Sequence, residues 1–446
     1  MVLDEKAKQG AKIFTLPVKN LPLPGKTKQK QKTSMNNSTA LQWIANNFAT
    51  AKADRKLLDT LFPADAAAEA QKFHLQIPGF EATPLRRLSA LAAKTGVKEI
   101  LVKDESLRLG LNAFKVLGGS YAIYKRLQQI HGKGQPLAFD EIRSSNLYAN
   151  VEPQVFVAAT DGNHGIGVAW AARELGYKAI IYVHQLTSRA RIEAIARQGA
   201  RVVVVPGTYD DAVKRAGADA EKNGWQVISD TSWEGYEEIP AWVMQGYTTM
   251  LAEAQQQMKV MAISRPTHVF VQGGVGALAA ATVGYFKQLY YDNPPRFVVT
   301  EPEAAACLYS SCRIADGEPH SFSGELDTIM AGLACGDPSP LAWNILRDYA
   351  DVFITCPDYV AARGMRVYGA PAGADPRVIS GESGAVTLGA LLAITEPKYA
   401  ALREHLGLDK NAQVLLINTE GDTDPQDYLK IVWDGRFPLP ENQERI

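Results

Sequence analysis

Residues 154–167 read QVFVAATDGNHGIG, an apolar run followed by a glycine-rich turn, and the helical pattern of residues 168–172 comes directly after them. The run 154–159 is largely apolar on both faces of an extended chain, which is typical of a parallel strand that helices cover on both sides. A glycine-rich turn between such a strand and a helix points backbone N–H groups at a ligand. The stretch therefore predicts one unit of an α/β fold with a ligand site at its turn.

The same pattern recurs along the chain, where apolar runs that favour strands alternate with helical segments. The further runs are residues 99–103, 179–183, 200–205, 267–272, 296–300 and 414–417, with a short one at 226–229. This alternation predicts an α/β architecture built on open, mostly parallel sheets. Ligands of such sheets bind beyond the carboxyl ends of the strands, so the polar turns that follow the strands form the candidate site.

A second glycine-rich turn, residues 273–277, follows one of these strands and opens a helix. Its backbone N–H groups are suited to a single phosphate. Residues 274–279 also fit the dinucleotide pattern G-x-G-x-x-A, and Glu301 stands after the next strand, where a ribose-binding acid is expected. The turn therefore predicts a phosphate site or a pyrophosphate site, and a purely structural turn is the third interpretation.

Two of the polar turns carry acids that can transfer protons. Asp161 and His164 stand in the first turn, although Asp161 is equally suited to capping the helix that follows. Asp230 stands three residues before Trp233 in a later turn, and an acid beside an indole ring is expected to have a raised pKa and to donate a proton. The alternative for Asp230 is also a turn cap.

Lys115 is flanked by Phe114 and Val116, which draw its backbone toward a core. An apolar pocket lowers the pKa of a lysine, and a lysine that is neutral near pH 7 can form a Schiff base with an aldehyde cofactor and then act as a general base. The alternative is that Lys115 opens an amphipathic helix and extends its ammonium group into water. Lys115 is therefore a candidate for the chemistry, in one of two interpretations.

Composition excludes several classes of partner. Of the 446 residues, 46% are hydrophobic and 21% are charged, and the net charge of −1 does not favour nucleic acid or a membrane surface. No apolar run approaches the roughly 20 residues that span a bilayer, and no secretory signal is present, so we expect a cytoplasmic protein. The four cysteines lack the spacing of a disulfide framework or a metal site, and the sequence leaves a Cys307–Cys335 bridge open.

The order of the turns resembles that of the fold-type II family of pyridoxal-phosphate enzymes, to which the β subunit of tryptophan synthase is similar. The general pattern consists of residues 83–85 (TPL), 103–105 (KDE), 114–115 (FK), 162–163 (GN) and the loop 273–277. A narrower pattern resembles the 2,3-diaminopropionate ammonia-lyases, and it consists of residues 112–115 (NAFK), 160–165 (TDGNHG), 230–236 (DTSWEGY), 239–240 (IP), 242–247 (WVMQGY), 327–333 (DTIMAGL) and 420–425 (EGDTDP). Several distinctive strings in register cover the chain from about residue 73 onward.

The resemblance implies two open, twisted, mostly parallel sheets flanked by helices and a site for pyridoxal 5'-phosphate (PLP). Lys115 would hold the cofactor as a Schiff base, and Asn163 would bind its 3-oxygen. The phosphate would be bound by Gly273, Gly274, Val275, Gly276 and Ala277. Thr419 falls where the family places a hydroxyl beside the ring nitrogen, and Asp422 is the rival for that place.

The narrower resemblance implies α,β-elimination of ammonia from D- and L-2,3-diaminopropionate, which yields pyruvate and ammonia. Lys115 would take the α-proton of the L isomer and Asp161 that of the D isomer. Asp230 would recognise or protonate the β-amino group, and Thr160 and His164 would lie against the substrate. Threonine and serine dehydratases, a second candidate, usually carry Ser in place of Ala113 and a small residue in place of Asp161.

Two further expectations concern organisation and alternatives. The resemblance implies a homodimer, with a large PLP-binding domain from residues 36–116 and 236–446 and a small domain from residues 117–235. Residues 1–35, rich in Lys and Gln, are expected to form a flexible basic extension. Outside the PLP enzymes, the alternatives are an NAD-dependent oxidoreductase that uses the 274–279 turn and a carrier that binds PLP without catalysis.

Overall fold

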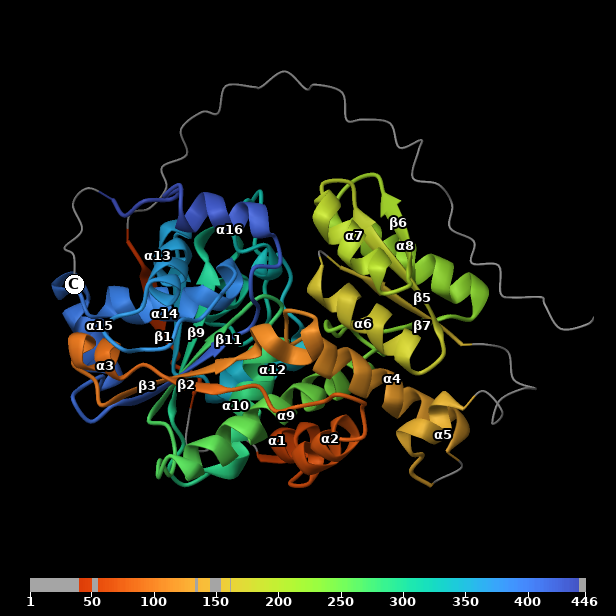
Figure 1. Ribbon diagram of the computed structural model, residues 1–446, viewed down its shortest axis with the longest axis horizontal. Coiled ribbons are helices and arrows are strands. Elements are labelled where there is room, and N and C mark those ends of the chain that lie inside the picture. The colour runs from red at the N-terminus through yellow and green to blue at the C-terminus, as the bar shows by residue number, and fades with distance from the viewer. Residues whose placement is uncertain (1–39, 50–54, 133–134, 145–153, 161, 441–446) are drawn as a thin grey trace, which may run out of the picture. The chain divides into compact units, whose positions relative to one another are not determined.

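Two β-sheets organise the computed structural model of the chain (Figure 1). The structure describes residues 40–49, 55–132, 135–144, 154–160 and 162–440. The predicted extension of residues 1–35 and the candidate base Asp161 lie outside the described residues. From residue 40 onward, the described part of the chain belongs to one compact unit.

The large sheet has seven strands in the order β1-β10-β9-β8-β11-β3-β2. Its five inner strands run parallel, and the two edge strands, β1 and β2, pair antiparallel with their neighbours. The bounds are β1 Gln42–Ala45, β2 Leu85–Arg87, β3 Glu99–Asp104, β8 His268–Gln272, β9 Arg296–Pro302, β10 Val352–Cys356 and β11 Gln413–Asn418. The prediction of a mostly parallel sheet is confirmed.

The small sheet has four parallel strands in the order β6-β5-β4-β7. The bounds are β4 Val155–Ala159, β5 Lys178–His184, β6 Arg201–Val205 and β7 Gln226–Val227. Each strand predicted from an apolar run is present in one of the two sheets. The edge strands β1 and β2 and the inner strand β10 were not predicted.

Sixteen α-helices lie within the described residues and pack on both sheets (Figure 1). Their bounds are α1 Arg55–Leu61, α2 Ala66–His74, α3 Ser89–Thr95, α4 Val116–His131, α5 Phe139–Arg143, α6 Asn163–Glu174, α7 Arg189–Arg197, α8 Tyr209–Asn223, α9 Glu238–Val260, α10 Ala277–Leu289, α11 Cys307–Ile314, α12 Pro340–Tyr349, α13 Asp358–Gly369, α14 Glu382–Ile394, α15 Ala400–Leu406 and α16 Pro425–Val432. Short 3₁₀ turns include η2 Glu105–Gly110 and η5 Ala331–Leu333. None of the described helices is both long and apolar enough to cross a membrane.

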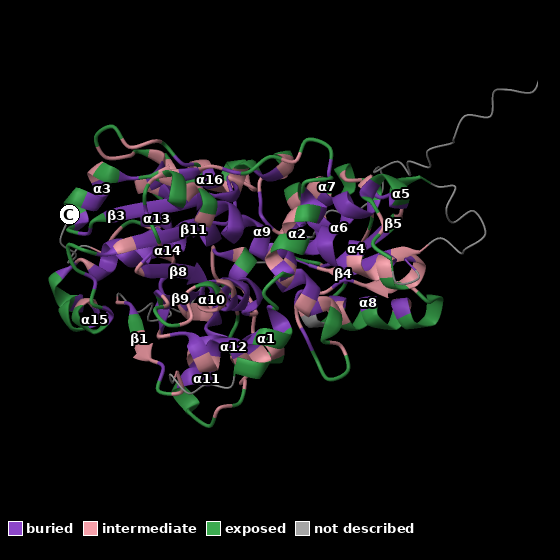
Figure 2. Cartoon of the chain, turned by 90° about the horizontal axis from the view of Figure 1, so that it is seen from below, coloured by how far each residue is buried: buried purple, intermediate pink, exposed green. Residues whose placement is uncertain are grey.

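The large sheet is covered on both faces because its strands are apolar on both sides. In β11, Leu415 and Ile417 belong to one core cluster, while the alternating Val414 and Leu416 belong to the other. Figure 2 shows β3, β8, β9 and β11 as buried elements. The first cluster continues without a break to Phe156 of the small sheet, so one core joins the two sheets.

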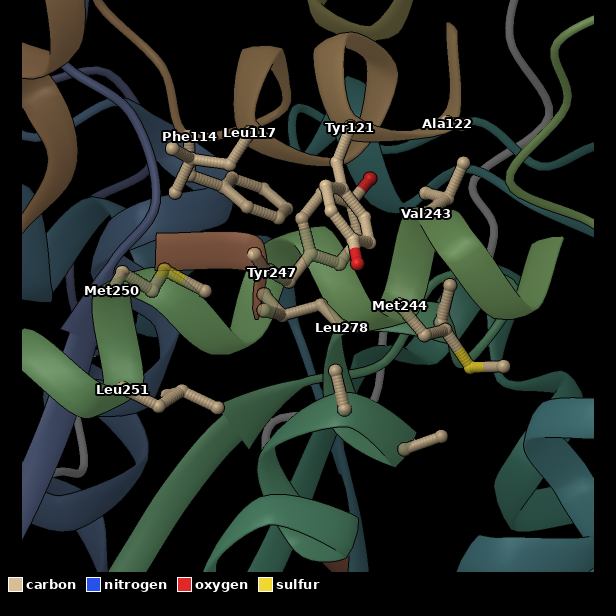
Figure 3. Packing of buried hydrophobic residues seen from close by; sticks show 14 of the residues in the cluster. Phe114, Leu117, Tyr121, Ala122, Val243, Met244, Tyr247, Met250, Leu251 and Leu278 are labelled. Carbon is tan, nitrogen blue, oxygen red and sulfur yellow. The ribbon is translucent and has the colours of Figure 1, made fainter. Parts of the chain in front are cut away.

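Helix α4 is held between α6 and α9 by two close backbone contacts. A Cβ added at Gly246 of α9 would lie 2.5 Å from the Leu117 carbonyl oxygen, and one added at Gly167 of α6 would lie 2.9 Å from the Val116 Cα. Only glycine permits either approach. Figure 3 shows Leu117 and Tyr121 of α4 packed over α9. The start of α4, where Lys115 stands, is thereby fixed from two sides.

A fully buried group of four charged side chains lies in the large-sheet part of the fold. Glu253 of α9 accepts hydrogen bonds from Lys103 Nζ at 2.6 Å and from Arg108 Nη2 at 2.7 Å. Arg108 also donates to Glu105 at 2.8 Å, and each of the four side chains is at most 2% exposed. The two cations and two anions balance, which is the condition under which buried charges are stable. None of these residues lines the pocket described below.

Candidate active site

A pocket of about 930 Å³, its open mouth included, lies at the carboxyl ends of the parallel strands, where the α/β architecture predicts a ligand site. Both sheets contribute to it, since Ala159 ends β4 and Gln272 ends β8. Of the predicted site residues, the pocket brings together Lys115, Thr160, Asn163, His164, Asp230, Gly273, Gly274, Val275, Ala277 and Thr419. Gly276 and Asp422 do not line it.

Lys115 directly precedes α4 and is positioned by the segment that follows β11. The Phe114 N–H donates to the Thr419 carbonyl oxygen at 3.1 Å, and Ala113 forms an isolated antiparallel bridge with Glu420. The Lys115 Nζ lies 2.5 Å from Asp230 Oδ2, and the two side chains are 21% and 11% exposed. A lysine and an aspartate 115 residues apart thus form an ion pair in the pocket wall.

The ion pair overturns two predicted pKa shifts. Burial alone would lower the pKa of Lys115, as predicted, but attraction to the Asp230 carboxylate holds that pKa above its ordinary value. Burial alone would raise the pKa of Asp230, but the Lys115 ammonium holds it below its ordinary value. Trp233 stacks on Tyr236 with ring centroids 4.0 Å apart and is 44% exposed, so its indole does not impose the predicted raised pKa. The pKa of Lys115 and that of Asp230 are therefore shifted in the directions opposite to those predicted.

The turn between β4 and α6 is held by Thr160. Its Oγ1 accepts from the Gly162 N–H at 3.0 Å and from the Gly165 N–H at 3.2 Å, and the residue is 4% exposed. His164 Nε2 lies 2.8 Å from the Ile228 carbonyl oxygen and therefore donates to it. Burial lowers the pKa of His164, so the ring is neutral and its Nδ1 is an acceptor, buried without a hydrogen-bond partner among the described residues.

Asn163, the first residue of α6, contacts a residue that was not predicted to belong to the site. Its Nδ2 donates to Glu420 Oε2 at 2.5 Å across 257 positions of sequence. The other carboxylate oxygen of Glu420 accepts from the Ser383 N–H at 3.2 Å, and Glu420 is 5% exposed. Glu420 follows Thr419 directly and begins the string EGDTDP, which carries the narrower resemblance. Its place in the site could therefore have been predicted from the sequence.

The glycine turn after β8 has the backbone of a phosphate cradle. Gly274 and Gly276 have φ of +64° and +99°, values that favour glycine, and the turn leads into the first residues of α10. The first turn of this 13-residue helix offers N–H groups without intrahelical acceptors and the positive end of the helix dipole. Gly276 faces away from the pocket, since a Cβ there would lie 3.1 Å from the Ala342 Cβ.

Glu301 does not lie where it could bind the ribose of a dinucleotide. It is fully buried and accepts from the Leu308 N–H at 2.9 Å and the Tyr309 N–H at 2.7 Å, which makes it a cap for α11. Burial raises its pKa to about 8. The carboxyl group of Glu301 is occupied inside the core, so the structure does not favour the dinucleotide interpretation of the 274–279 turn, which required Glu301 to bind a ribose.

Thr419 and Asp422, the two candidates for the ring nitrogen, have different surroundings. Thr419 is 4% exposed and lines the pocket. Asp422 accepts from Asn112 Nδ2 at 3.2 Å and does not line the pocket. The geometry favours the hydroxyl of Thr419.

Several lining residues were not predicted as site residues from the sequence. Tyr247, Thr423 and the residues of η5 lie in strings that carry the narrower resemblance, whereas Arg191, Tyr209, Ser383 and Cys335 lie outside those strings. Arg191 and Tyr209 stand near the starts of α7 and α8, in the small-sheet part of the chain. Cys307, Cys312, Cys335 and Cys356 all lie within the described residues and form no disulfide.

The pocket offers a suitable partner for each functional group of PLP. Its aldehyde requires a lysine amine, its phosphate dianion requires backbone N–H groups, and its ring nitrogen and 3-oxygen require polar side chains. Lys115, the lining residues Gly274, Val275 and Ala277 of the glycine turn, Thr419 and Asn163 supply these groups within one pocket. The donor set therefore fits the cofactor.

Comparisons with known proteins agree with this chemistry. A family model described as "Pyridoxal-phosphate dependent enzyme" matches residues 77–420. The chain is 48% identical over 381 residues to the diaminopropionate ammonia-lyase of Escherichia coli strain K12, over 85% of this chain and 94% of that protein. It is also similar to the crystal structure of the E. coli enzyme in complex with D-serine, at 44% identity and a TM-score of 0.83, over 90% of this chain and 99% of that one.

A second crystal structure of the E. coli enzyme contains an aminoacrylate-PLP azomethine reaction intermediate. It matches at 44% identity with a TM-score of 0.81, again over 90% of this chain and 99% of that one. These matches cover nearly the whole length of the relatives. The chain belongs to the diaminopropionate ammonia-lyases within the family of pyridoxal-phosphate-dependent enzymes.

Proposed function

We propose that the chain eliminates ammonia from both isomers of 2,3-diaminopropionate and releases pyruvate. The observation that carries the proposal is the Lys115–Asp230 ion pair, which lies in one pocket with the glycine turn at the start of α10. The E. coli relative with 48% identity, named for the reaction with diaminopropionate, supports it. The D-serine in a related crystal structure supports access for a D-amino acid.

The cofactor, when bound, supplies an electron sink for the negative charge that develops on the substrate's α-carbon. Lys115 would hold its aldehyde, and the turn from Gly273 to Ala277 its phosphate. Asn163 would bind the 3-oxygen. Thr419 would lie at the ring nitrogen, and a hydroxyl there leaves that nitrogen largely unprotonated. All other steps fall to side chains of this chain.

Asp230 is suited to recognise the substrate's β-ammonium group. Its carboxylate is ionised and already binds one alkylammonium group, that of Lys115, at 2.5 Å. The β-ammonium group of diaminopropionate is the same chemical group on a shorter chain, so it can take the same position on Asp230. A hydroxyl group in that position, as in serine, would leave the carboxylate without a cation. This favours a diamino acid over a hydroxyamino acid.

The two isomers present their α-protons on opposite faces of the cofactor ring, so two bases are required. Lys115 would serve the L isomer and Asp161 the D isomer. We expect Asp161→Asn to lower turnover of the D isomer by about 10²-fold or more, since a general base contributes about that much, and to spare most of the turnover of the L isomer. Steady-state rates with each pure isomer measure this. Equal losses on both isomers would remove Asp161 from the role.

The proposed function is tested by pyruvate release from the purified chain supplied with PLP. D-diaminopropionate, L-diaminopropionate and L-serine are offered separately. Release from both diaminopropionate isomers, well above that from serine, is the expected result. Release from serine alone would assign the chain to the dehydratases, and no release from any of the three would leave a carrier without catalysis.

We also propose that the active form is a cytoplasmic homodimer with two domains per chain, residues 36–116 with 236–446 and residues 117–235. The confinement of β4 to β7 to the second of these ranges supports the division. Light scattering of the purified chain measures its mass in solution. A monomer that retains full activity would overturn the dimer.

A further inference from the structure

We infer that Glu420 is a positioning residue that orients the Asn163 amide toward the 3-oxygen of the bound cofactor. The inference rests on the proposed function, which places Asn163 beside that oxygen. It assigns a task to a buried carboxylate that the reaction itself does not use. Glu420 lines the pocket and is 5% exposed.

A carboxylate fixes the direction of an amide because it can only accept hydrogen bonds. Asn163 Nδ2 lies 2.5 Å from Glu420 Oε2, so the nitrogen of the amide must face Glu420 and the oxygen must face away. One N–H of Nδ2 is used in this contact, and the second remains to be donated elsewhere. An asparagine without such a partner would be free to turn its amide by 180° and present its oxygen instead.

Glu420 is itself held rigidly enough to do this. Its Oε1 accepts from the Ser383 N–H at 3.2 Å in the first turn of α14, where the helix dipole stabilises a negative charge. Its backbone pairs with Ala113, and the neighbouring Thr419 carbonyl oxygen accepts from the Phe114 N–H. The same backbone pairing therefore places both Lys115 and Glu420 in the pocket.

A second buried glutamate, Glu382, provides a control for the substitution of Glu420. Glu382, also in the first turn of α14, is 9% exposed and does not line the pocket. Burial, and then the negative charge of Glu420, raises the pKa of Glu382 to about 7, which shows that the two groups are close. Replacing Glu382 removes a buried glutamate next in sequence to Ser383, whose N–H donates to Glu420, at a position that does not line the pocket.

The test is a double-mutant cycle on PLP binding to the full-length apoprotein, with the apparent Kd and the visible absorption band of the bound cofactor as readouts. Glu420→Ala and Asn163→Ala should each raise the Kd about tenfold, the value of one lost hydrogen bond, and shift the band alike. The double variant should bind no more than about twofold more weakly than either single variant, because both changes remove one interaction. Glu420→Gln, which keeps an acceptor oxygen, should recover most of the affinity.

Three outcomes would overturn the inference. Additive effects in the double variant, about 100-fold in total by the same principle, would show that Glu420 acts independently of Asn163. If Glu382→Ala weakened PLP binding as much as Glu420→Ala, the effect of Glu420→Ala would be explained by a general structural disturbance near α14 and not by its hydrogen bond to Asn163. An Asn163→Ala variant with unchanged Kd and band would overturn both the inference and the assignment of Asn163, while pyruvate release by the unmodified chain would still uphold the proposed function.

Discussion

The Lys115→Ala variant is expected to carry no covalently attached PLP and to release pyruvate at least about 10³-fold more slowly, since it lacks both the attachment point and a general base. The structure adds a second consequence. Without the ammonium group 2.5 Å away, the buried carboxylate of Asp230 loses the partner that lowers its pKa. The variant should therefore also be less stable as an apoprotein.

Lys115→Arg separates these two effects. Arginine keeps a positive charge beside Asp230 but does not form the bond with the cofactor. Borohydride reduction followed by mass spectrometry of the intact protein measures attachment, and thermal unfolding of the apoproteins measures stability. Neither variant should gain the mass of the cofactor, and Lys115→Arg should unfold close to the unmodified chain. Attached cofactor in either variant would remove Lys115 from its assigned place.

The sign of the pH dependence follows from the two shifts. Asp230 has a lowered pKa, so its contribution to stability is present above the ordinary carboxyl pKa and is lost as the pH falls. Lys115 has a raised pKa, so its contribution is present below the ordinary lysine pKa and is lost as the pH rises. The stability difference between the apoproteins of the unmodified chain and Lys115→Ala should thus be largest between about pH 4 and pH 10.

Glu253→Gln is expected to lower the free energy of unfolding by about 3–5 kcal/mol, the usual cost of removing one partner from a buried ion pair. Glu253 accepts from both Lys103 and Arg108, and without its charge two buried cations share the single carboxylate of Glu105. A loss of this size is a large part of the stability of an ordinary protein. The pocket contains none of these residues, so activity at low temperature should change little.

The same substitution at an exposed ion pair is the control. Glu193 accepts from Arg189 at 2.6 Å, but these side chains are 49% and 83% exposed. Surface pairs contribute little because water screens them. Denaturant unfolding of the two variants compares their stabilities. If Glu253→Gln cost no more than Glu193→Gln, the buried group would not stabilise the fold.

The fold was predictable from sequence because its strands are buried on both faces and so have continuous apolar runs. The inner strand β10, with the sequence VFITC, carries the same signal, although it was not among the predicted strands. The edge strands β1 and β2 have only four and three residues and are partly exposed. Their assignment depends on pairing with β10 and β3, which no local pattern encodes.

The sequence predicted which segments form the site, but it did not predict the directions of the pKa shifts of Lys115 and Asp230. The glycine turns and Lys115 have local signals, because their chemistry depends on the backbone around them. The pKa shifts depend on contacts between residues far apart in the sequence, such as Lys115 with Asp230 and Asn163 with Glu420. An apolar neighbour indicates burial, but only the folded chain shows which charge lies beside a buried group and which effect on the pKa prevails.

The two glycine contacts of α4 have a mechanical consequence. Gly246 lets the backbone of α9 approach Leu117 closely, and Gly167 lets the backbone of α6 approach Val116. The two contacts are thus at adjacent residues of α4. At both contacts the nearest opposing atoms belong to the backbone, so no side chain can change its rotamer to let α4 shift. Lys115 precedes Val116 directly, so the backbones of α6 and α9 hold the lysine in place.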